Sequence, residues 1–235
     1  AGTLGGGLAG VLGGLLYGLI AASQSVEAGA GALSVLLVVL CLTVLMAVIG
    51  GAGVGLGIAA AAWFFGSSWL ASTAGGALGG LLVGAVVKLL GIDAFNLLFG
   101  QSPGDITGAV EGVILGGAVG LGAWLAVTRA GQVSGARIVS VAALAGAMAG
   151  MAIALLNGRL MVGSLDLLAR QFSGSRLRLD PFGRLFGEEG FGQITQLVTG
   201  GLEGALFAAC IVGAILLAAA RSQAQSGRTI HSTSL

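Results

Sequence analysis

Charged residues are scarce in this chain, and their scarcity excludes several classes of protein. Only 8% of the 235 residues are Asp, Glu, Lys or Arg, whereas a typical soluble domain has about 25%. The formal net charge is +1. The sequence contains no basic run interleaved with aromatic residues, the pattern that indicates contact with nucleic acid. We therefore expect neither a soluble domain nor a nucleic-acid partner.

Residue types that carry most enzyme chemistry are also rare. The two cysteines, Cys41 and Cys210, lie inside apolar segments, without a histidine or another cysteine at metal-ligand spacing. The chain has one histidine, and it lacks Ser-His-Asp, Cys-His and HExxH arrangements and a phosphate-binding glycine loop. The sequence therefore predicts a non-enzymatic protein with no disulfide, no bound metal and no other cofactor.

Proline is rare, whereas glycine and hydrophobic residues are abundant. The chain has two prolines and 46 glycines, but it shows no Gly-X-Y period, so neither collagen nor a proline-rich disordered segment fits. Hydrophobic residues make up 56% of the chain, and the mean hydropathy is +1.04. This composition predicts an all-α polytopic membrane protein with the lipid bilayer around it.

The apolar segments predict a bundle of about six transmembrane helices. The second segment is long enough to cross the membrane once as a bent helix or twice as a hairpin, and a hairpin would make seven spans. We favour the single bent helix. Trp63, Phe64, Phe65 and Trp69 then form an aromatic belt at one membrane interface. The expected spans are Leu4 to Ala22, Leu33 to Phe65, Thr73 to Leu90, Ser102 to Arg129, Arg137 to Leu156 and Ile194 to Ala220.

Glycine recurs at every fourth position in five of these segments. Residues four apart lie on one face of a helix, so this spacing removes side chains from that face and allows another helix backbone to approach closely. The pattern predicts glycine-zipper packing. The positions are Gly6, Gly10, Gly14, Gly18, Gly76, Gly80, Gly84, Gly108, Gly112, Gly116, Gly120, Gly146, Gly150, Gly200 and Gly204.

An internal repeat indicates duplication within the chain. The pattern D-x-F-x-x-L-F-G occurs at Asp93, Phe95 and Phe99 and again at Asp180, Phe182 and Phe186, and the pairs Glu111-Gly112 and Glu203-Gly204 follow it. Each copy contains two spans, so the copies are expected to run parallel, unlike inverted transporter repeats. Helix start and stop signals predict that each D-x-F-x-x-L-F-G element is a short interfacial helix, or alternatively a re-entrant gate.

These features divide the chain into consecutive parts. Residues 1–72 form a two-span segment, residues 73–129 the first repeat copy, and residues 137–221 the second copy. The second copy carries a charge-dense insertion at residues 157–190, in which residues 161–172 are expected to form an amphipathic surface helix. Residues 222–235 are expected to form a flexible polar tail.

Glu111 and Glu203 are the candidate functional residues. A carboxylate inside a membrane helix is costly, so it indicates a proton or cation site by default. Lys88 and Arg159 are placed to pair with Glu111 and Glu203 respectively, although Lys88 could equally extend to the interface. A structural alternative is that each glutamate marks a membrane boundary, because 18 residues separate it from the next arginine in both copies.

The sequence favours a structural or assembly subunit of a larger membrane complex, packed through its glycine faces against itself or other membrane chains. The alternative is a small transporter or channel in which Glu111 and Glu203 bind a proton or cation, so an ion or small-molecule substrate remains open. The expected location is a bacterial-type inner membrane or an organellar membrane, with cytoplasmic termini.

Overall fold

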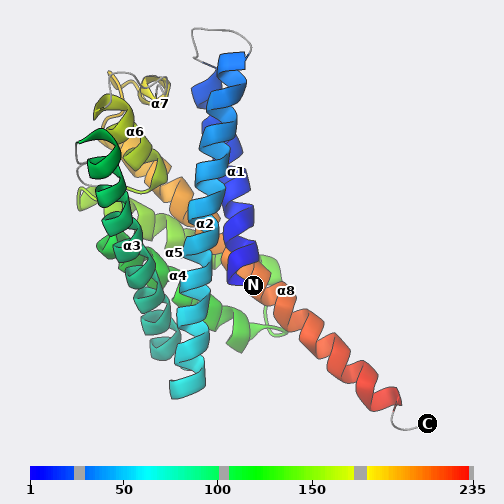
Figure 1. Ribbon diagram of the computed structural model, residues 1–235. Coiled ribbons are helices and arrows are strands. Elements are labelled where there is room, and N and C mark those ends of the chain that lie inside the picture. The colour runs from blue at the N-terminus through cyan, green and yellow to red at the C-terminus, as the bar shows by residue number, and fades with distance from the viewer. Residues whose placement is uncertain (24–29, 101–105, 172–178, 233–235) are drawn as a thin grey trace.

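The computed structural model describes residues 1–23, 30–100, 106–171 and 179–232, and within these ranges the chain is helical (Figure 1). Six helices of this described part are long and apolar enough to cross a membrane, which confirms an all-α multi-pass architecture. The spanning helices are α1 (Gly2–Ala22), α2 (Ala30–Phe65), α3 (Trp69–Phe99), α4 (Ala109–Arg129), α5 (Gly135–Leu155) and α8 (Gln193–Ser232). The shorter helices are α6 (Met161–Gln171) and α7 (Asp180–Leu185).

Helix α2 is continuous, so the prediction of a single helix is confirmed and the alternative of a hairpin is wrong. At about 1.5 Å per residue its 36 residues extend over roughly 54 Å, well beyond a hydrocarbon core of about 30 Å. The glycines in its second half do not end the helix. They contact α1 and α3, where Gly51 lies against Gly2 and Gly57 lies against Gly75.

Most neighbouring helices pack antiparallel to each other. Helix α1 packs on α2, α2 on α3, α3 on α4, and α5 on α8, while α4 also contacts α5 and α8. Helix α8 passes behind the other helices and also contacts α1 (Figure 1). Both termini lie toward one end of the bundle, as six spans require, and α6 and α7 lie toward the other end (Figure 1).

The glycines let backbones meet where these helices cross. A Cβ built on Gly80 in α3 would collide with the carbonyl of Gly112 in α4, and a Cβ on Gly112 would collide with the carbonyl of Gly80. Gly146 and Gly204 show the same reciprocal collision between α5 and α8. Side chains therefore cannot be added at these crossings without separating the helices.

Bulkier side chains fill the spaces between the crossings. Val54 of α2, Val119 of α4 and Ile211 of α8 form one buried cluster at the centre of the bundle. A second cluster joins Tyr17 of α1 to Val162 of α6 and Phe182 of α7. Helices α6 and α7 are therefore packed onto the transmembrane helices through apolar contacts.

The repeated D-x-F-x-x-L-F-G element has different structures in its two copies. The second copy forms the separate short helix α7, as predicted, with Pro181 in its first turn. The first copy is the last part of α3, so the prediction of a short helix there is wrong. Ala94 stands in the first copy where the second has Pro181. Alanine allows the preceding helix to continue, whereas proline disfavours a helical residue before it.

Two further predictions need correction. Helix α6 occupies nearly the predicted range, but residues 162–166 are buried in the bundle, so α6 is not simply a surface helix. Its apolar first half packs on α1 and α7 because the bundle offers it an apolar surface. Residues 222–232 of the expected flexible tail continue α8 as a helix, since the segment contains no proline and extension of a formed helix is easy. Residues 172–178 of the charged insertion lie outside the described residues.

Alanine substitutions in α4 should distinguish a glycine that contacts the backbone of α3 from one that does not. Gly112→Ala should destabilise the protein by about 1–3 kcal/mol, because its methyl group would collide with the Gly80 carbonyl. Gly117→Ala is the matched control in the same helix. Its Cβ would meet atoms no closer than 3.8 Å, so the higher helix propensity of alanine should stabilise the protein by up to about 1 kcal/mol.

The measurement is the unfolding midpoint of each purified variant in a mild detergent. Equal midpoints for the two variants, or a less stable Gly117→Ala protein, would contradict the close contact between α3 and α4.

Candidate functional site

Polar side chains from three parts of the chain converge on the loop between α5 and α6. We call Thr107, Glu111, Ser164, Gln196 and Glu203 the polar cluster. Thr107 precedes α4, Glu111 is in its first turn, Ser164 is in α6, and the other two are in α8. The cluster determines where α6 begins within the bundle.

Glu203 binds the first backbone amides of α6. Its Oε2 atom accepts a hydrogen bond of 2.8 Å from the Met161 amide, and its Oε1 atom accepts one of 2.9 Å from the Val162 amide. Amides in the first turn of a helix have no partner within that helix, and the helix dipole favours a negative charge there. Glu203 therefore acts as an N-terminal cap that α8 supplies to α6.

Glu111 has a different position, at the start of its own helix. Its Oε2 atom accepts a 2.9 Å hydrogen bond from the Gly108 amide, which is the glutamate half of a capping box. A Cβ at Gly158 would lie 2.8 Å from the other carboxylate oxygen. Both glutamates thus lie beside the α5–α6 loop, Glu111 at its glycine and Glu203 at the helix that follows it.

The two glutamates lie at different depths in their helices. Glu111 is two residues after the start of α4, whereas Glu203 is ten residues after the start of α8, or about 15 Å along its axis. Glu111 is therefore near the start of its helix and Glu203 well inside its helix, and the interpretation of each glutamate as a membrane-boundary marker stays a prediction. Thr107 and Thr195 occupy equivalent places in the repeat, but Thr107 precedes α4 and Thr195 lies inside α8.

The first turn of α8 has its own cap. Glu188 accepts hydrogen bonds of 2.9 Å from the amides of Ile194 and Thr195, and one of 2.6 Å from the Thr195 hydroxyl. The hydrogen bonds from Thr195 lower the pKa of Glu188 below 4.5, because they stabilise its charged form. Glu188 thus caps α8, which begins two residues before Thr195, whereas α4 begins two residues after Thr107.

Further hydrogen bonds hold the loop in place. The Thr107 hydroxyl donates to the Arg159 carbonyl over 2.8 Å, and the Thr107 amide donates to the Ser164 hydroxyl over 3.0 Å. The Gln196 side-chain amide donates to the Gly158 carbonyl over 2.7 Å. The start of α4, the start of α8 and the start of α6 are therefore linked through one loop.

The structure brings the predicted cations near this region. The Lys88 side chain lies against Gly108, where a Cβ would come within 2.7 Å of the Lys88 Cδ atom. The Arg159 side chain packs on Gly163 in the first turn of α6. The proposed pairings of Lys88 with Glu111 and of Arg159 with Glu203 stay predictions.

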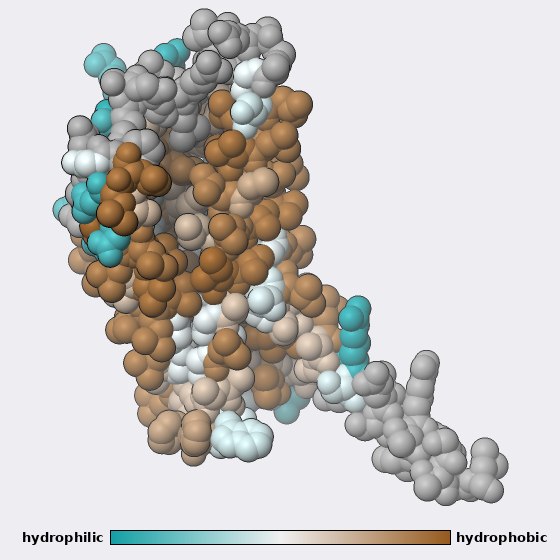
Figure 2. Space-filling view, in the orientation of Figure 1, coloured by the Kyte–Doolittle hydropathy of each residue, from teal (hydrophilic) through white to brown (hydrophobic). Residues whose placement is uncertain are grey.

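A large apolar cavity lies beside the polar cluster. Its volume is about 370 Å³, and α1, α2, α3, α4, α6 and α8 contribute to its walls. Figure 2 shows the recess between the side formed by α3 and α6 and the side formed by α1 and α2, bordered largely by hydrophobic residues. Among the described residues its charged lining side chains are Glu111 and Glu203, and its aromatic ones are Tyr17, Phe95 and Phe207.

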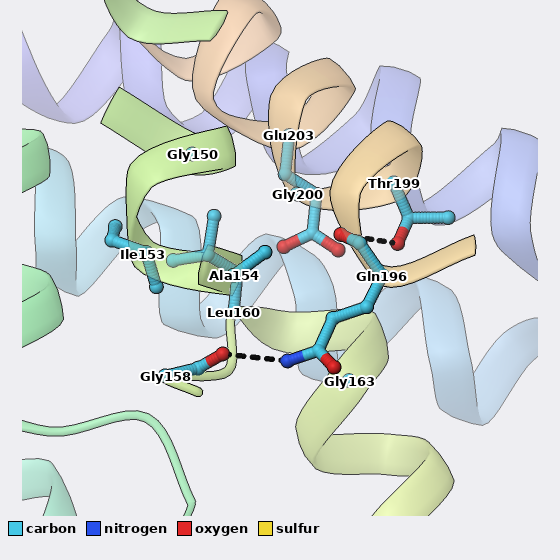
Figure 3. A pocket seen from close by; sticks show the side chains of 10 residues that line it. All are labelled: Gly150, Ile153, Ala154, Gly158, Leu160, Gly163, Gln196, Thr199, Gly200 and Glu203. Carbon is cyan, nitrogen blue, oxygen red and sulfur yellow. Dashed lines mark hydrogen bonds between the residues drawn. The ribbon is translucent and has the colours of Figure 1, made fainter. Parts of the chain in front are cut away.

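A second cavity, of about 10 Å³, lies on another side of Glu203. Figure 3 shows the Glu203 carboxylate between Gln196, Thr199 and Leu160. This volume is close to the minimum that holds one water molecule. Glu203 and Leu160 line both cavities, so they separate the small polar cavity from the large apolar one.

Tyr17 is a site residue that the sequence analysis missed. It is 2% exposed, it lines the large cavity, and its hydroxyl has no hydrogen-bond partner among the described residues. Its ring packs on Phe182 with a centroid distance of 5.8 Å. Tyr17 is the only tyrosine in the chain and stands in a span of glycine and aliphatic residues. A single tyrosine in such a span was the sequence signal that could have identified it as a site residue.

The repeated element contributes little to the polar cluster. Asp93 is exposed, Phe95 lines the large cavity, and Phe182 packs on Tyr17. Phe186 is 37% exposed and Asp180 is half-buried beside Gly190. The side chain of Phe99 lies outside the described residues. The first copy therefore reaches the large cavity through Phe95, and the second lies behind the cavity wall.

The charges of α6 lie toward its far end. Asp166 accepts a 2.7 Å hydrogen bond from Arg170 one turn later, which also forms an ion pair. Burial raises the pKa of Asp166, while Arg170 and Arg159 oppose the rise. This pair is one helical turn or more from the Glu203 contacts and helps to fix the outer half of α6.

Replacing Glu203 by glutamine should loosen the start of α6. A glutamine side chain offers one acceptor oxygen, so one of the Met161 and Val162 amides would lose its partner, at a cost of about 1–3 kcal/mol. Hydrogen exchange at these two amides should accelerate by at least about tenfold. The exposed Glu189→Gln variant is the control and should exchange like the wild type. Unchanged exchange in Glu203→Gln would show that the cap has no energetic role.

The cap on α8 should depend on pH. Because the pKa of Glu188 is lowered in the folded protein, its stabilisation is present above about pH 4.5 and is lost as the pH falls through the lowered pKa. The unfolding midpoints of wild type and Glu188→Gln should therefore differ at about pH 6 and converge toward about pH 3. A difference that stays constant over this range would exclude the charged cap.

Comparisons with known proteins add no identity to this geometry. No protein-family model matches the chain, and neither the curated proteins nor the solved structures give a match. The arguments for a function therefore start from the polar cluster and the two cavities.

Proposed function

We propose that this protein takes up an amphipathic small molecule from the bilayer into its large cavity and carries it within the membrane. The main support for this proposal is the cavity of about 370 Å³. Its walls are mostly apolar, and the polar cluster lies at one end. This role is a form of the transporter that the sequence left as its alternative. The proposed substrate is mainly apolar, unlike a bare proton or metal cation.

The size and lining of the cavity support this role. Small-molecule sites have volumes of about 300–1,000 Å³ and apolar walls with a few polar groups that orient the ligand. Leu115, Met46 and Phe207 supply apolar surface from α4, α2 and α8, whereas Thr107 and Glu203 supply polar groups at one end. An apolar chain with a polar end matches this distribution.

The position of the cavity supports entry from the lipid. Helices α2 and α3 meet through Gly53, Gly57, Gly75 and Gly79 at one end, and they diverge toward the other end (Figure 1). The cavity lies between the diverging parts, where Met46 of α2 and Val87 of α3 line it. A bilayer molecule is already concentrated and oriented in the membrane beside such an opening.

The glycine faces fit a role inside the bundle. We propose that they are glycine zippers and that the two parallel repeats use them in the same way, since Gly112 faces Gly80 and Gly204 faces Gly146. Gly112 and Gly204 each follow a glutamate of the polar cluster. Tight pairs α3–α4 and α5–α8 would then form rigid walls around a space that remains open between them.

A complex subunit is the second candidate. Helix α8 continues through residues 223–232 beyond its membrane-spanning part, and this segment projects away from the bundle (Figure 1). Such a segment suits contact with another membrane chain or a second copy. A stoichiometric partner in mild-detergent preparations would favour this role. The type of host membrane and the cytoplasmic location of the termini remain parts of the proposal.

Filling the cavity should abolish ligand uptake. Gly13 lines the cavity, and a Cβ there meets the Tyr17 ring at 3.6 Å and Thr43 at 3.8 Å, which are ordinary contacts. Gly13→Leu should therefore fold and occupy cavity volume. Gly7→Leu is the control in the same helix, since a Cβ at Gly7 meets one side-chain atom, at 3.4 Å.

The probe is dodecanol, and the readout is the mass of the bound complex by native mass spectrometry. Wild type and Gly7→Leu should retain one molecule, and Gly13→Leu should bind at least about tenfold more weakly. Transbilayer movement of a fluorescent dodecyl probe in proteoliposomes should fall in parallel. Equal affinity of all three proteins for dodecanol, or failure of wild type to bind any probe with a dodecyl chain, would overturn the proposed function.

A further inference from the structure

We propose that the ligand of the large cavity is an amphipathic amine, whose ammonium group binds between the Glu203 carboxylate and the Tyr17 phenol. This inference rests on the proposed function and adds the chemical class of the ligand. It concerns the end of the cavity at which α1, α6 and α8 meet.

The charge of the cavity wall favours a cationic ligand. Among the described residues that line it, the charged side chains are the carboxylates Glu111 and Glu203. In surroundings of low dielectric constant a carboxylate attracts a cation strongly and repels an anion equally strongly. The wall therefore disfavours fatty acids and alkyl sulfates and favours a molecule with a positive head.

Glu203 can accept further hydrogen bonds from a ligand. An ionised carboxylate has about four acceptor positions, and Glu203 uses two of them for the amides of Met161 and Val162. The start of α6 carries about half a positive charge, which favours the ionised form of the Glu203 carboxyl. An ammonium group can use the remaining positions without displacing α6.

The Tyr17 hydroxyl is a second polar group that could bind the head of the ligand. This side chain is 98% buried, and its hydroxyl lacks a hydrogen-bond partner among the described residues. Buried hydroxyls are normally paired, so an unpaired one beside a cavity indicates a missing partner. Tyr17 packs with Val162, whose amide Glu203 binds, and both Tyr17 and Glu203 line the large cavity. The phenol oxygen can accept a hydrogen bond from an ammonium group, and the ring can bind a cation through its face.

Of the two carboxylates in the cavity wall, Glu203 is the better placed to bind an ammonium group. The Lys88 side chain lies beside Gly108, whose amide Glu111 already binds. Helix α6 carries the Asp166–Arg170 ion pair, one turn or more beyond the Glu203 contacts. Glu203 also separates the large cavity from the small polar one, where Gln196 and Thr199 lie. Glu203 is therefore the carboxylate placed to meet a ligand from the apolar side.

The test compares three probes with the same dodecyl chain and different heads: dodecylamine, which is a cation at neutral pH, dodecanol, which is neutral, and dodecyl sulfate, which is an anion. Their affinities for the full-length protein are measured by native mass spectrometry. Wild type should bind dodecylamine at least about tenfold more tightly than dodecanol and should bind dodecyl sulfate most weakly. High salt should change this order little, because the site is shielded from solvent.

Two variants test whether Tyr17 and Glu203 produce the preference for dodecylamine. Tyr17→Phe keeps the packing on Phe182 and removes the hydroxyl, so it should weaken dodecylamine binding by about three- to tenfold and leave dodecanol binding unchanged. Glu203→Gln should reduce dodecylamine binding to the level of dodecanol. The Tyr17→Phe variant keeps the test valid even where Glu203→Gln disturbs α6.

The outcomes separate the two proposals. Equal binding of the amine and the alcohol by wild type would overturn the amine assignment and leave the proposed carrier intact. An unchanged amine preference in Tyr17→Phe and Glu203→Gln would also overturn the assignment. Failure of all three probes to bind would overturn the proposed carrier itself.

Discussion

Direct contact between helix backbones is the interaction on which this structure depends. In lipid the side chains gain little by leaving one apolar environment for another, so close packing and hydrogen bonds must hold helices together. Glycine allows that packing where α3 crosses α4 and where α5 crosses α8, because each carbonyl occupies the place of a missing side chain on the other helix. The large cavity lies beside these contacts, with α3, α4 and α8 among its walls.

The starting points of α4 and α8 give their two glutamates different positions. Glu188 caps α8 ten residues before Glu203, whereas α4 starts two residues before Glu111, so Glu203 lies about 15 Å into its helix and Glu111 about 3 Å. Glu203 binds amides of α6 instead of its own helix, so α6 begins inside the bundle. Glu111 stays at the start of α4 and lies against the α5–α6 loop. The two glutamates therefore reach the same cavity from different depths of their helices.

Much of the fold could be predicted from the sequence, because hydropathy and glycine spacing are local properties. The six spans, the continuity of α2 and the place of α6 follow from such patterns. The shared D-x-F-x-x-L-F-G pattern did not predict the continuous end of α3, because Ala94 lets a helix continue where Pro181 favours the start of a new one. Glu203 was identified as a candidate, but its partners at Met161 and Val162 lie some 40 residues away and have no side-chain signal. Tyr17 was missed because only the folded chain brings it to the cavity.

A disulfide between α3 and α4 tests the central claim most directly. A Cβ at Gly117 would lie 3.8 Å from the Cβ of Ala77, which is close to the average separation in disulfides, about 3.8 Å. The measurement uses Ala77→Cys with Gly117→Cys in a chain whose Cys41 and Cys210 are replaced by alanine, oxidised in native membranes. If α3 and α4 pack within one chain, the product is a cross-linked monomer that reduction reverses. No cross-link, or a cross-linked dimer as the main product, would contradict the account.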